Sequence, residues 1–361
     1  MAIPLRTGYE EASYVIYERH GAYYAKDGRT GDIVYGGPNN VGGVSGTDAA
    51  AVIQAAINAL TSGGKVFVKA GTYNLGTQIN VPTKIHIQGE GLNKTILNAT
   101  DLTMTVLYIT ANYSEVSDLQ IQAANLKTAG HGIQLLGASW SSIHHVRLDR
   151  QYNGIYAALL SGLFIDKVWI YNSKTNHILL EGYNDVYISK VVADNPDVAD
   201  RPQGLHVYAA SGLWVSDCDF IRCDNGFLVD PTMGYNVIGL FIKGVAADSC
   251  SGRGFYITSA NGGTVRGTHL DQIWASTDVY GVYLQGSGVE GVRINEAEIF
   301  HNGRDGIVLD AGVSEVDIED CDIIANSTET LDTYNGINVV GGVSEFRVRG
   351  NRIGPGWGET E

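Results

Sequence analysis

The phrases GLHVY at Gly204 and GFLVD at Gly226 are two copies of one short repeat, a Gly or His followed by alternating apolar residues. Further copies are GIQLL at Gly132, GIYAA at Gly154, HILLE at His177, GFYIT at Gly254, GVYLQ at Gly281, GIVLD at Gly306 and GINVV at Gly336. Their spacing of roughly 22 to 30 residues is typical of solenoids. A second alternation, such as FIDKVWIY, follows about ten residues after most copies, and a period of two indicates strands. The sequence therefore predicts an all-β fold, a right-handed parallel β-helix of about ten coils.

The composition agrees with a solenoid. The chain of 361 residues contains 46 Gly and 7 Pro. Gly and Asn tolerate the left-handed backbone that the corners of such coils require. Because each coil packs only on its neighbours, a chain of this length needs no single large core.

Charge and hydropathy limit the partners. A net charge of −15 and a pI near 4.9 argue against nucleic acid and anionic membranes. No apolar run reaches the length of a membrane-spanning helix, and the start MAIPLRTG does not resemble a signal peptide. The sequence leaves the oligomeric state open, and a homo-oligomer is one of the alternatives.

Superposing the repeats predicts which side chains face the core. The expected inward column is Ile143, Ile165, Ile188, Val215, Ile242, Val265, Ile294 and Ile318. Cys218 and Cys321 then share an inward column four coils apart, too far for a disulfide. Cys223 and Cys250 fall in one corner column on adjacent coils. They form either a disulfide or two small residues stacked in place of Asn302 and Asn326.

The N-terminal part differs from the repeats. Residues 1–40 alternate around a DGRTG turn, which predicts a small β-hairpin module before a β-helix domain of residues 41–361. An amphipathic helix is expected over residues 48–61, with Thr47 or Asp48 as the N-cap. Such a helix would cover the open end of the solenoid, where strand edges would otherwise pair with other chains.

Three motifs carry a family resemblance. DAAAVIQAAI at Asp48–Ile57, GGKVFVKAGTY at Gly63–Tyr73 and IQGEG at Ile87–Gly91 resemble the N-terminal signature of the pectate-lyase-like superfamily. The resemblance implies the same right-handed parallel β-helix. It also implies a carbohydrate-active protein, since the superfamily includes polysaccharide lyases, glycoside hydrolases, sugar epimerases and phage tailspikes. We therefore expect a polysaccharide as partner and an extracellular or virion-associated location. Fold alone does not determine the chemistry.

The repeat places polar residues together on one outer face. The third and fifth residues of each phrase are expected to point outward, which brings Glu181, His206, Tyr208 and Asp230 together on three consecutive coils. Two inserted loops, residues 195–203 and 231–236, would wall a groove over them. The candidate substrate-binding residues near this groove are Tyr156, Arg222, Tyr256, Tyr283 and Gln285.

Three functions fit this face. For β-elimination on a uronate-containing polysaccharide, which the resemblance favours, Tyr208 or His206 would be the base, and Arg201 would neutralise the substrate carboxylate. For inverting glycoside hydrolysis, Glu181 and Asp230 stand two coils apart, about 9.6 Å between backbones, close to the roughly 6.5–9.5 Å of an inverting pair. The third is a glycan-binding, tailspike-like or adhesive protein without catalysis.

A second acidic group lies further along the chain. Glu296, Glu298, Asp320 and Asp322 fall on neighbouring coils, one coil after His269. Stacked carboxylates can hold Ca²⁺, so Glu298 and Asp322 are weak candidates for metal ligands. Pairing of these carboxylates with Arg349 and Arg352 on the next coil is the preferred interpretation, and the sequence requires no cofactor.

Overall fold

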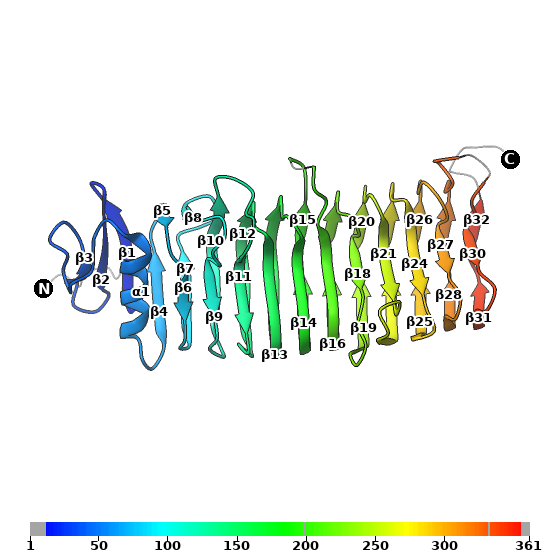
Figure 1. The fold of residues 1–361 in the computed structure, drawn as a ribbon, viewed down its shortest axis with the longest axis horizontal. Helices are drawn as coiled ribbons and strands as arrows, with labels where there is room; N and C mark the ends of the chain where they lie inside the picture. Colours follow the sequence, from blue (N-terminus) through cyan, green and yellow to red (C-terminus); the bar gives the residue numbers. More distant parts are fainter. Residues whose placement is uncertain (1–11, 198, 331–332, 355–361) are drawn as a thin grey trace, which may run out of the picture. The chain divides into compact units, whose positions relative to one another are not determined.

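The computed structural model describes residues 12–197, 199–330 and 333–354. They form an all-β right-handed solenoid of about ten turns with one short helix near the N-terminus (Figure 1), which confirms the predicted fold class. The chain divides into two compact units. The first comprises the residues up to Tyr156 with Leu163–Trp169, and the second comprises Ala157–Gly162 with the residues from Ile170 on. No helix among the described residues is long and apolar enough to cross a membrane.

The first unit begins with three antiparallel strands. These are β1 (Tyr14–Arg19), β2 (Ala22–Asp27) and β3 (Ile33–Gly36). The Asp27 carboxylate accepts hydrogen bonds from the backbone N–H groups of Arg29 at 2.8 Å and Thr30 at 2.9 Å, which forms the DGRTG turn. The expected hairpin is therefore present, and residues 1–11 of the predicted module lie outside the described residues. β1 also pairs in parallel with β4 (Gly64–Val68), so the hairpin continues the solenoid sheet.

The helix α1 (Ala49–Ala59) follows, slightly shorter than predicted. Asp48 is the N-cap and accepts a hydrogen bond from the N–H of Ala51 at 3.0 Å. The apolar face is buried as expected, except that Leu60 is the half-buried C-cap. The Gln54 amide bonds the backbone of Asn80 through both its oxygen and its nitrogen, at 2.7 and 2.9 Å. The helix thus occupies the hydrogen-bonding groups of an edge strand, as a neighbouring strand would.

The other strands of the first unit are parallel and belong to successive coils. They are β5 (Gly71–Leu75), β6 (Ile79–Val81), β7 (Ile85–Gly89), β8 (Thr95–Ala99), β9 (Leu107–Ile109), β10 (Glu115–Ala123), β11 (His131–Leu136) and β12 (Ser141–Asp149). β13 (Asn153–Tyr171) carries residues of both units. The predicted core residues Ile143 and Ile165 are fully buried in this unit.

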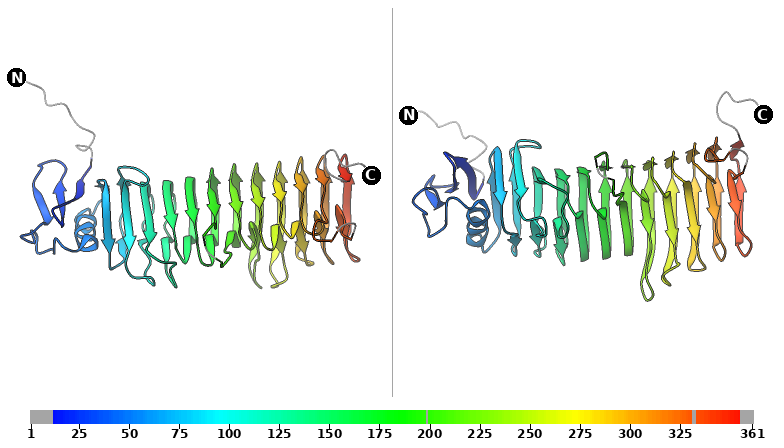
Figure 2. Two further views of the ribbon diagram at one scale, coloured as in Figure 1. Left: turned by 90° about the horizontal axis from the view of Figure 1, so that it is seen from above. Right: turned by 45° about the horizontal axis from the view of Figure 1, so that its top comes forward.

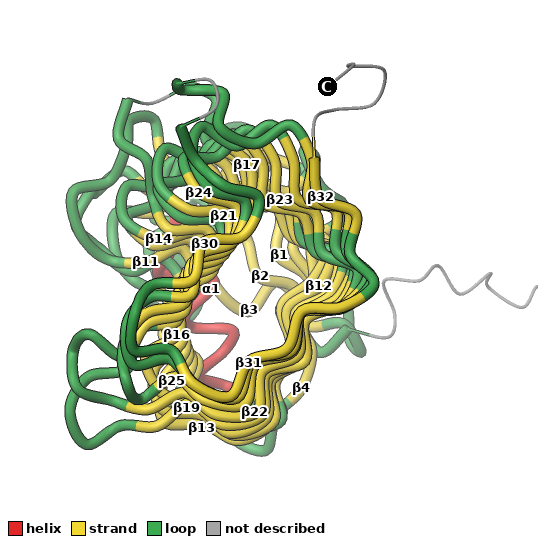
Figure 3. The backbone as a smooth tube through the Cα atoms, turned by 90° about the vertical axis from the view of Figure 1, so that its right-hand side faces the viewer, coloured by secondary structure: helices red, strands yellow, loops and turns green. Residues whose placement is uncertain are grey.

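The second unit repeats a coil of three strands, which lie over one another from coil to coil (Figures 2 and 3). The first and second strands are continuous in β14 (Asn176–Ser189) and β16 (Gln203–Ser216). Later first strands are β18 (Phe227–Val229), β21 (Arg253–Thr258), β24 (Tyr280–Gln285), β27 (Ile307–Leu309) and β30 (Ile337–Val339). Later second strands are β19 (Asn236–Lys243), β22 (Thr264–Asp271), β25 (Val289–Asn295), β28 (Ser314–Glu319) and β31 (Ser344–Arg349). Third strands are β15 (Val192–Asp194), β17 (Asp219–Ile221), β20 (Ala246–Asp248), β23 (Trp274–Ser276), β26 (Glu298–Phe300), β29 (Asp322–Ile324) and β32 (Arg352–Gly354).

The core column of the second strands agrees with the prediction except at one coil. The observed partners, all at most 1% exposed, are Ile188, Val215, Ile242, Leu270, Ile294 and Ile318. Val265 was expected beside Ile242, but it pairs with Val237, five residues nearer the start of the strand. The left-handed residue Gly267 (φ 66°) lies between Val265 and Leu270 and interrupts the alternation. Three residues of this strand are buried, Val265, Thr268 and Leu270, and the prediction aligned the first of them with Ile242 instead of the last.

The corner after the third strands contains a buried ladder of polar side chains. The N–H of Cys250 donates to the Asp278 carboxylate at 2.7 Å, and the N–H of Asp278 donates to Asn302 Oδ1 at 3.0 Å. Asn302 continues the ladder to Asn326 Oδ1 through its own N–H at 3.2 Å. All cysteines among the described residues are free thiols, Cys223 and Cys250 included. The second of the two predicted alternatives, stacked small residues in the asparagine column, is therefore the observed one.

Candidate functional site

The outward column of the first strands has the predicted register. Leu179 pairs with His206, His206 with Leu228, and Leu228 with Tyr256, and the column continues to Tyr283. Exposure differs along it, because Leu179, His206 and Leu228 are each only 7–8% exposed whereas the two tyrosines are half-buried. The column therefore offers side chains to a ligand mainly through its later members and through residues that follow it.

A β-bulge lies at the centre of the predicted cluster. Leu180 pairs with Val207, but the next pair is Glu181 with Ala209, so Tyr208 is an extra residue in its strand. The expected side-by-side pairing of Glu181 with Tyr208 is therefore wrong in register. Bulges often re-aim a side chain near a site. Both carboxyl groups still act on Tyr208 electrostatically: burial, and then the charges of Asp230 and Glu181, raise the pKa of Tyr208.

His206 is held as a neutral ring beneath Tyr208. The two ring centroids are 4.2 Å apart at an interplanar angle of 38°. His206 Nδ1 lies 3.0 Å from the side-chain oxygen of Asn176, which assigns the proton to Nδ1 and the lone pair to Nε2. Nε2 is buried without a hydrogen-bond partner. Burial lowers the pKa of His206 to about 4, so the ring is uncharged at neutral pH.

Asp230 stands where the first strand meets an inserted loop. Its carboxylate is half-buried, and Asn261 Nδ2 donates to its two oxygens at 2.8 and 2.9 Å. Burial raises the pKa of Asp230, and the Asn261 hydrogen bond lowers it in part. Beyond Asp230, an isolated bridge between Thr232 and Gly262 ties the loop of residues 231–236 to the next coil. The carboxyl group is thus fixed in position and favours the protonated state more than an exposed aspartate does.

The two predicted arginines are held at a corner of the coil. Arg222 makes a bidentate ion pair with Asp194 of the third strand β15, and its Nε lies 2.8 Å from Asp194 Oδ1. Arg201 donates to the backbone oxygen of Ser249, also at the corner after a third strand. Both guanidinium groups therefore serve contacts within the protein, and the structure does not gather them around Tyr208.

Sequence reasoning missed Arg253, which lies among the predicted tyrosines. Its guanidinium is 4.1 Å from the ring centroid of Tyr256 and 4.9 Å from that of Tyr283. One face of each of these rings is thus covered by a cation, and less ring surface is open to a sugar than expected. The signal was present in the sequence, because Arg253 directly precedes the repeat phrase at Gly254.

The hydroxyl groups of these tyrosines also have partners. Tyr256 Oη donates to Gln285 Oε1, Tyr283 Oη donates to Asp310 Oδ2 at 3.1 Å, and Gln285 Nε2 donates to the same Asp310 oxygen at 3.2 Å. Burial, followed by the Asp310 charge, raises the pKa of Tyr283 to about 12. Tyr256, Tyr283 and Gln285, three of the predicted substrate-binding residues, thus form one connected polar patch with Asp310, and Arg222 lies outside it.

Tyr156 belongs to the first unit, where it stacks on His131 with centroids 4.7 Å apart. The weak metal candidates Glu298 and Asp322 pair in register on third strands, with Arg352 next in the column, whereas His269 lies on a second strand. Arg349 pairs with Glu319 instead of the carboxylates predicted for it. Among residues 12–197, 199–330 and 333–354, no group of three or more His, Cys, Asp or Glu side chains could hold a metal ion.

Comparison with known proteins agrees with this architecture. The family model described as the right-handed beta helix region matches residues 131–273 and 233–353. The chain belongs to this family. No curated protein sequence matches it.

Solved β-helix structures resemble the chain at low sequence identity. The Dettilon tailspike protein is 14% identical with a TM-score of 0.63, over 85% of this chain and 67% of that one. The catalytic domain of a GH87 α-1,3-glucanase in complex with nigerose is 13% identical with a TM-score of 0.53, over 84% and 67%. The A-module of mannuronan C-5 epimerase AlgE6 from Azotobacter vinelandii is 15% identical with a TM-score of 0.51, over 86% and 83%. These likenesses show the shared fold.

Within this β-helix protein, the cluster has the parts for proton transfer. Two carboxyl groups act on one tyrosine, and one of them, Asp230, has a raised pKa. A tyrosine whose pKa is raised keeps its proton at neutral pH, so Tyr208 is a hydrogen-bond donor and a poor base.

Proposed function

We propose that this protein is a glycoside hydrolase that cleaves a polysaccharide with inversion at the anomeric carbon. One observation carries the proposal: Glu181, Tyr208 and Asp230 lie on three successive coils of one face, and, after burial, the charges of Asp230 and Glu181 raise the pKa of Tyr208. The tailspike, glucanase and epimerase structures with the same fold support a carbohydrate as the ligand class.

The two carboxyl groups have different roles. Asp230, whose pKa is raised by burial, is the general acid that protonates the glycosidic oxygen as the bond to the anomeric carbon breaks. Glu181 is the general base, which takes a proton from the water that attacks the opposite face of the sugar. Their strands are two coils apart, about 9.6 Å at about 4.8 Å per coil, which leaves room for this water. Tyr208 donates a hydrogen bond to the sugar or to the water.

β-Elimination on a uronate is less well supported. It requires a base for the proton α to the carboxylate, and burial, followed by the charges of Asp230 and Glu181, raises the pKa of Tyr208 and keeps it protonated. His206 is neutral but buried, with a pKa of about 4, and is therefore a weak base of limited access. The arginines proposed to neutralise the uronate are engaged with Asp194 and the Ser249 carbonyl.

The test is an activity screen on a panel of polysaccharides with two readouts. Hydrolysis releases reducing ends without ultraviolet absorbance, and elimination adds the absorbance of a new double bond. Glu181→Gln and Asp230→Asn should each lower kcat by several orders of magnitude, because each loses its proton-transfer function. Glu296→Gln, an exposed glutamate between the second and third strands of its coil, is the matched control and should keep full activity. Absorbing products, or full activity in both variants, would refute the hydrolase.

A further inference from the structure

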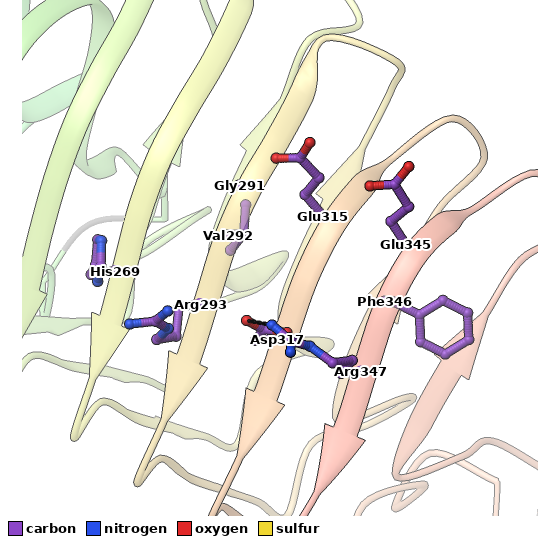
Figure 4. A pocket seen from close by; sticks show the side chains of 9 residues that line it. All are labelled: His269, Gly291, Val292, Arg293, Glu315, Asp317, Glu345, Phe346 and Arg347. Atoms are coloured by element: carbon purple, nitrogen blue, oxygen red, sulfur yellow. Dashed lines mark hydrogen bonds and ion pairs between the residues drawn. The ribbon is translucent and has the colours of Figure 1, made fainter.

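A hollow of about 490 Å³ opens on the outer face of the second strands, where β22, β25, β28 and β31 are neighbours (Figure 4). It lies on a different strand of the coil from Glu181, Tyr208 and Asp230, which belong to the first strands or directly follow them. Its size falls within the roughly 300–1,000 Å³ of small-molecule sites. The hollow is therefore a candidate binding site separate from the proposed catalytic one.

One wall of the hollow is a column of charged side chains. His269, Arg293, Asp317 and Arg347 are register partners on four successive coils. Arg347 holds Asp317 by two hydrogen bonds, at 2.7 Å from Nε to Oδ1 and 2.9 Å from Nη2 to Oδ2. Arg293, on the other side of Asp317, is exposed and points its guanidinium along the wall (Figure 4). Because Arg347 Nε and Nη2 donate to Asp317, the Arg293 guanidinium is the main donor that this wall offers to a ligand.

The opposite wall is acidic. Glu315 and Glu345 follow Gly291 in one column, and both adopt a left-handed backbone, with φ of 56° and 54°. Gly291 has no side chain. A Cβ at this position would project towards Glu315 and lie 4.0 Å from its Oε2, so the glycine keeps the space between the two walls open. Figure 4 shows both glutamate side chains standing above the row of Arg293, Asp317 and Arg347. This wall offers only acceptors.

An aromatic stack ends at the hollow. Tyr187, Trp214, Phe241 and His269 stack face to face along the second strands, with centroids 4.7, 5.5 and 5.3 Å apart. Because each inner ring is covered on both faces, the stack presents ring edges to solvent. His269 is the last ring, and its second face is turned towards the coil of Arg293. The Arg293 guanidinium points towards this ring (Figure 4), so His269 and Arg293 line this end of the hollow together.

These observations restrict the ligand. Guanidinium groups only donate and carboxylates only accept, so a ligand that fits both walls must do both at many points. A hydroxyl group donates and accepts, and a neutral sugar carries several. The hollow is lined by three carboxylates and only two guanidinium groups, which disfavours binding of a negatively charged sugar. The carboxylates are Glu315, Glu345 and Asp317, and the guanidinium groups are those of Arg293 and Arg347. We propose that this hollow binds one neutral sugar unit of an oligosaccharide.

The test is glycan-array binding by the full chain, with neutral and acidic oligosaccharides, followed by calorimetry on the strongest neutral ligand. Arg293→Ala and Glu315→Gln should each weaken this binding at least tenfold. Arg266→Ala is the matched control, because Arg266 pairs with Glu290 on the same face outside the hollow. It should bind like the unaltered chain. Equal thermal unfolding midpoints of the variants would show that the fold is intact.

Asp230→Asn separates this proposal from the hydrolase proposal. It should abolish hydrolysis and leave array binding unchanged, so either proposal can fail alone. The sugar site is overturned if only acidic glycans bind, if no glycan binds, or if neutral binding persists in Arg293→Ala. It is also overturned if free lysine, a zwitterion that could bridge both walls, binds in place of the neutral glycan.

Discussion

Asp278 should contribute least to stability among the polar side chains Asp278, Asn302 and Asn326 of the buried corner ladder. Asp278→Asn should therefore stabilise the protein at neutral pH. Asn302 and Asn326 are the next two members of the ladder. In each, the side-chain oxygen accepts from the N–H of the preceding member, and the amide nitrogen donates to a backbone carbonyl. Asp278 Oδ1 accepts from the Cys250 N–H, but its Oδ2 is buried without a hydrogen-bond partner. Asp278 therefore lacks the donor that its position requires.

The neighbouring coils show what an amide would gain. Asn302 Nδ2 donates to the Ala275 carbonyl at 3.1 Å. Ala247 precedes Ala275 in the same column, so an amide at position 278 is expected to donate to the Ala247 carbonyl. Satisfying a buried polar atom is worth about 1–3 kcal/mol. We expect Asp278→Asn to raise the free energy of unfolding by about that amount at pH 7.

The effect should depend on pH in a defined direction. Burial, and then the neighbouring Cys250, raise the pKa of Asp278 well above its ordinary value of 3.8. A group with a raised folded-state pKa stabilises the fold fully below its unfolded pKa, and this contribution is lost as the pH rises through the folded value. The stability difference between the variant and the unaltered protein should therefore be small near pH 3.5 and grow towards neutral pH.

Chemical denaturation at several pH values measures both effects. Asn302→Asp is the matched control, since it places the same unsatisfied carboxyl group one coil further along and should destabilise by about 1–3 kcal/mol at pH 7. The reasoning is refuted if Asp278→Asn is less stable than the unaltered protein at pH 7, or if the difference does not change with pH.

Three further predictions follow from the geometry. Ile188→Ala should cost about 2–4 kcal/mol in denaturant unfolding, because the residue is 1% exposed in a close-packed column; a loss below about 0.5 kcal/mol would contradict the register. Asn261→Ala removes the hydrogen bond that lowers the pKa of Asp230, so the alkaline limb of kcat should move to higher pH, and an unmoved limb would exclude Asp230 as the acid. Reductant should leave the unfolding midpoint unchanged, because Cys223 and Cys250 are free thiols; a fall in the midpoint would indicate a disulfide.

The sequence predicted the fold well because the signals for it are local and repeated. Gly and apolar alternation recur in every coil, so the register of the first strands followed from superposing the phrases. The prediction failed at Val265 for a physical reason. A left-handed glycine, Gly239 in β19 and Gly267 in β22, separates the inward positions of each strand, and the prediction aligned Val265, before the glycine of β22, with Ile242, after the glycine of β19.

The candidate site was predicted less completely, because it depends on departures from the repeat. The bulge at Tyr208 shifts the strand by one residue exactly where Glu181 was placed opposite it, and no spacing rule locates such a bulge. Even so, Tyr208 remains between the two carboxyl groups, because a bulge moves a side chain within its coil and not to another coil.

Partners of charged residues were the hardest part to predict. Arg222 and Arg253 have similar positions near coil corners in the sequence, yet one pairs with Asp194 and the other lies against the rings of Tyr256 and Tyr283. Asp194 lies 28 residues before Arg222 and Tyr283 lies 30 residues after Arg253, so each is one coil away, whereas Tyr256 lies in the same strand as Arg253. In a solenoid, each side chain meets the coils before and after its own. The repeat fixes the position of a residue, while the chemistry of its site is set by side chains that differ from coil to coil.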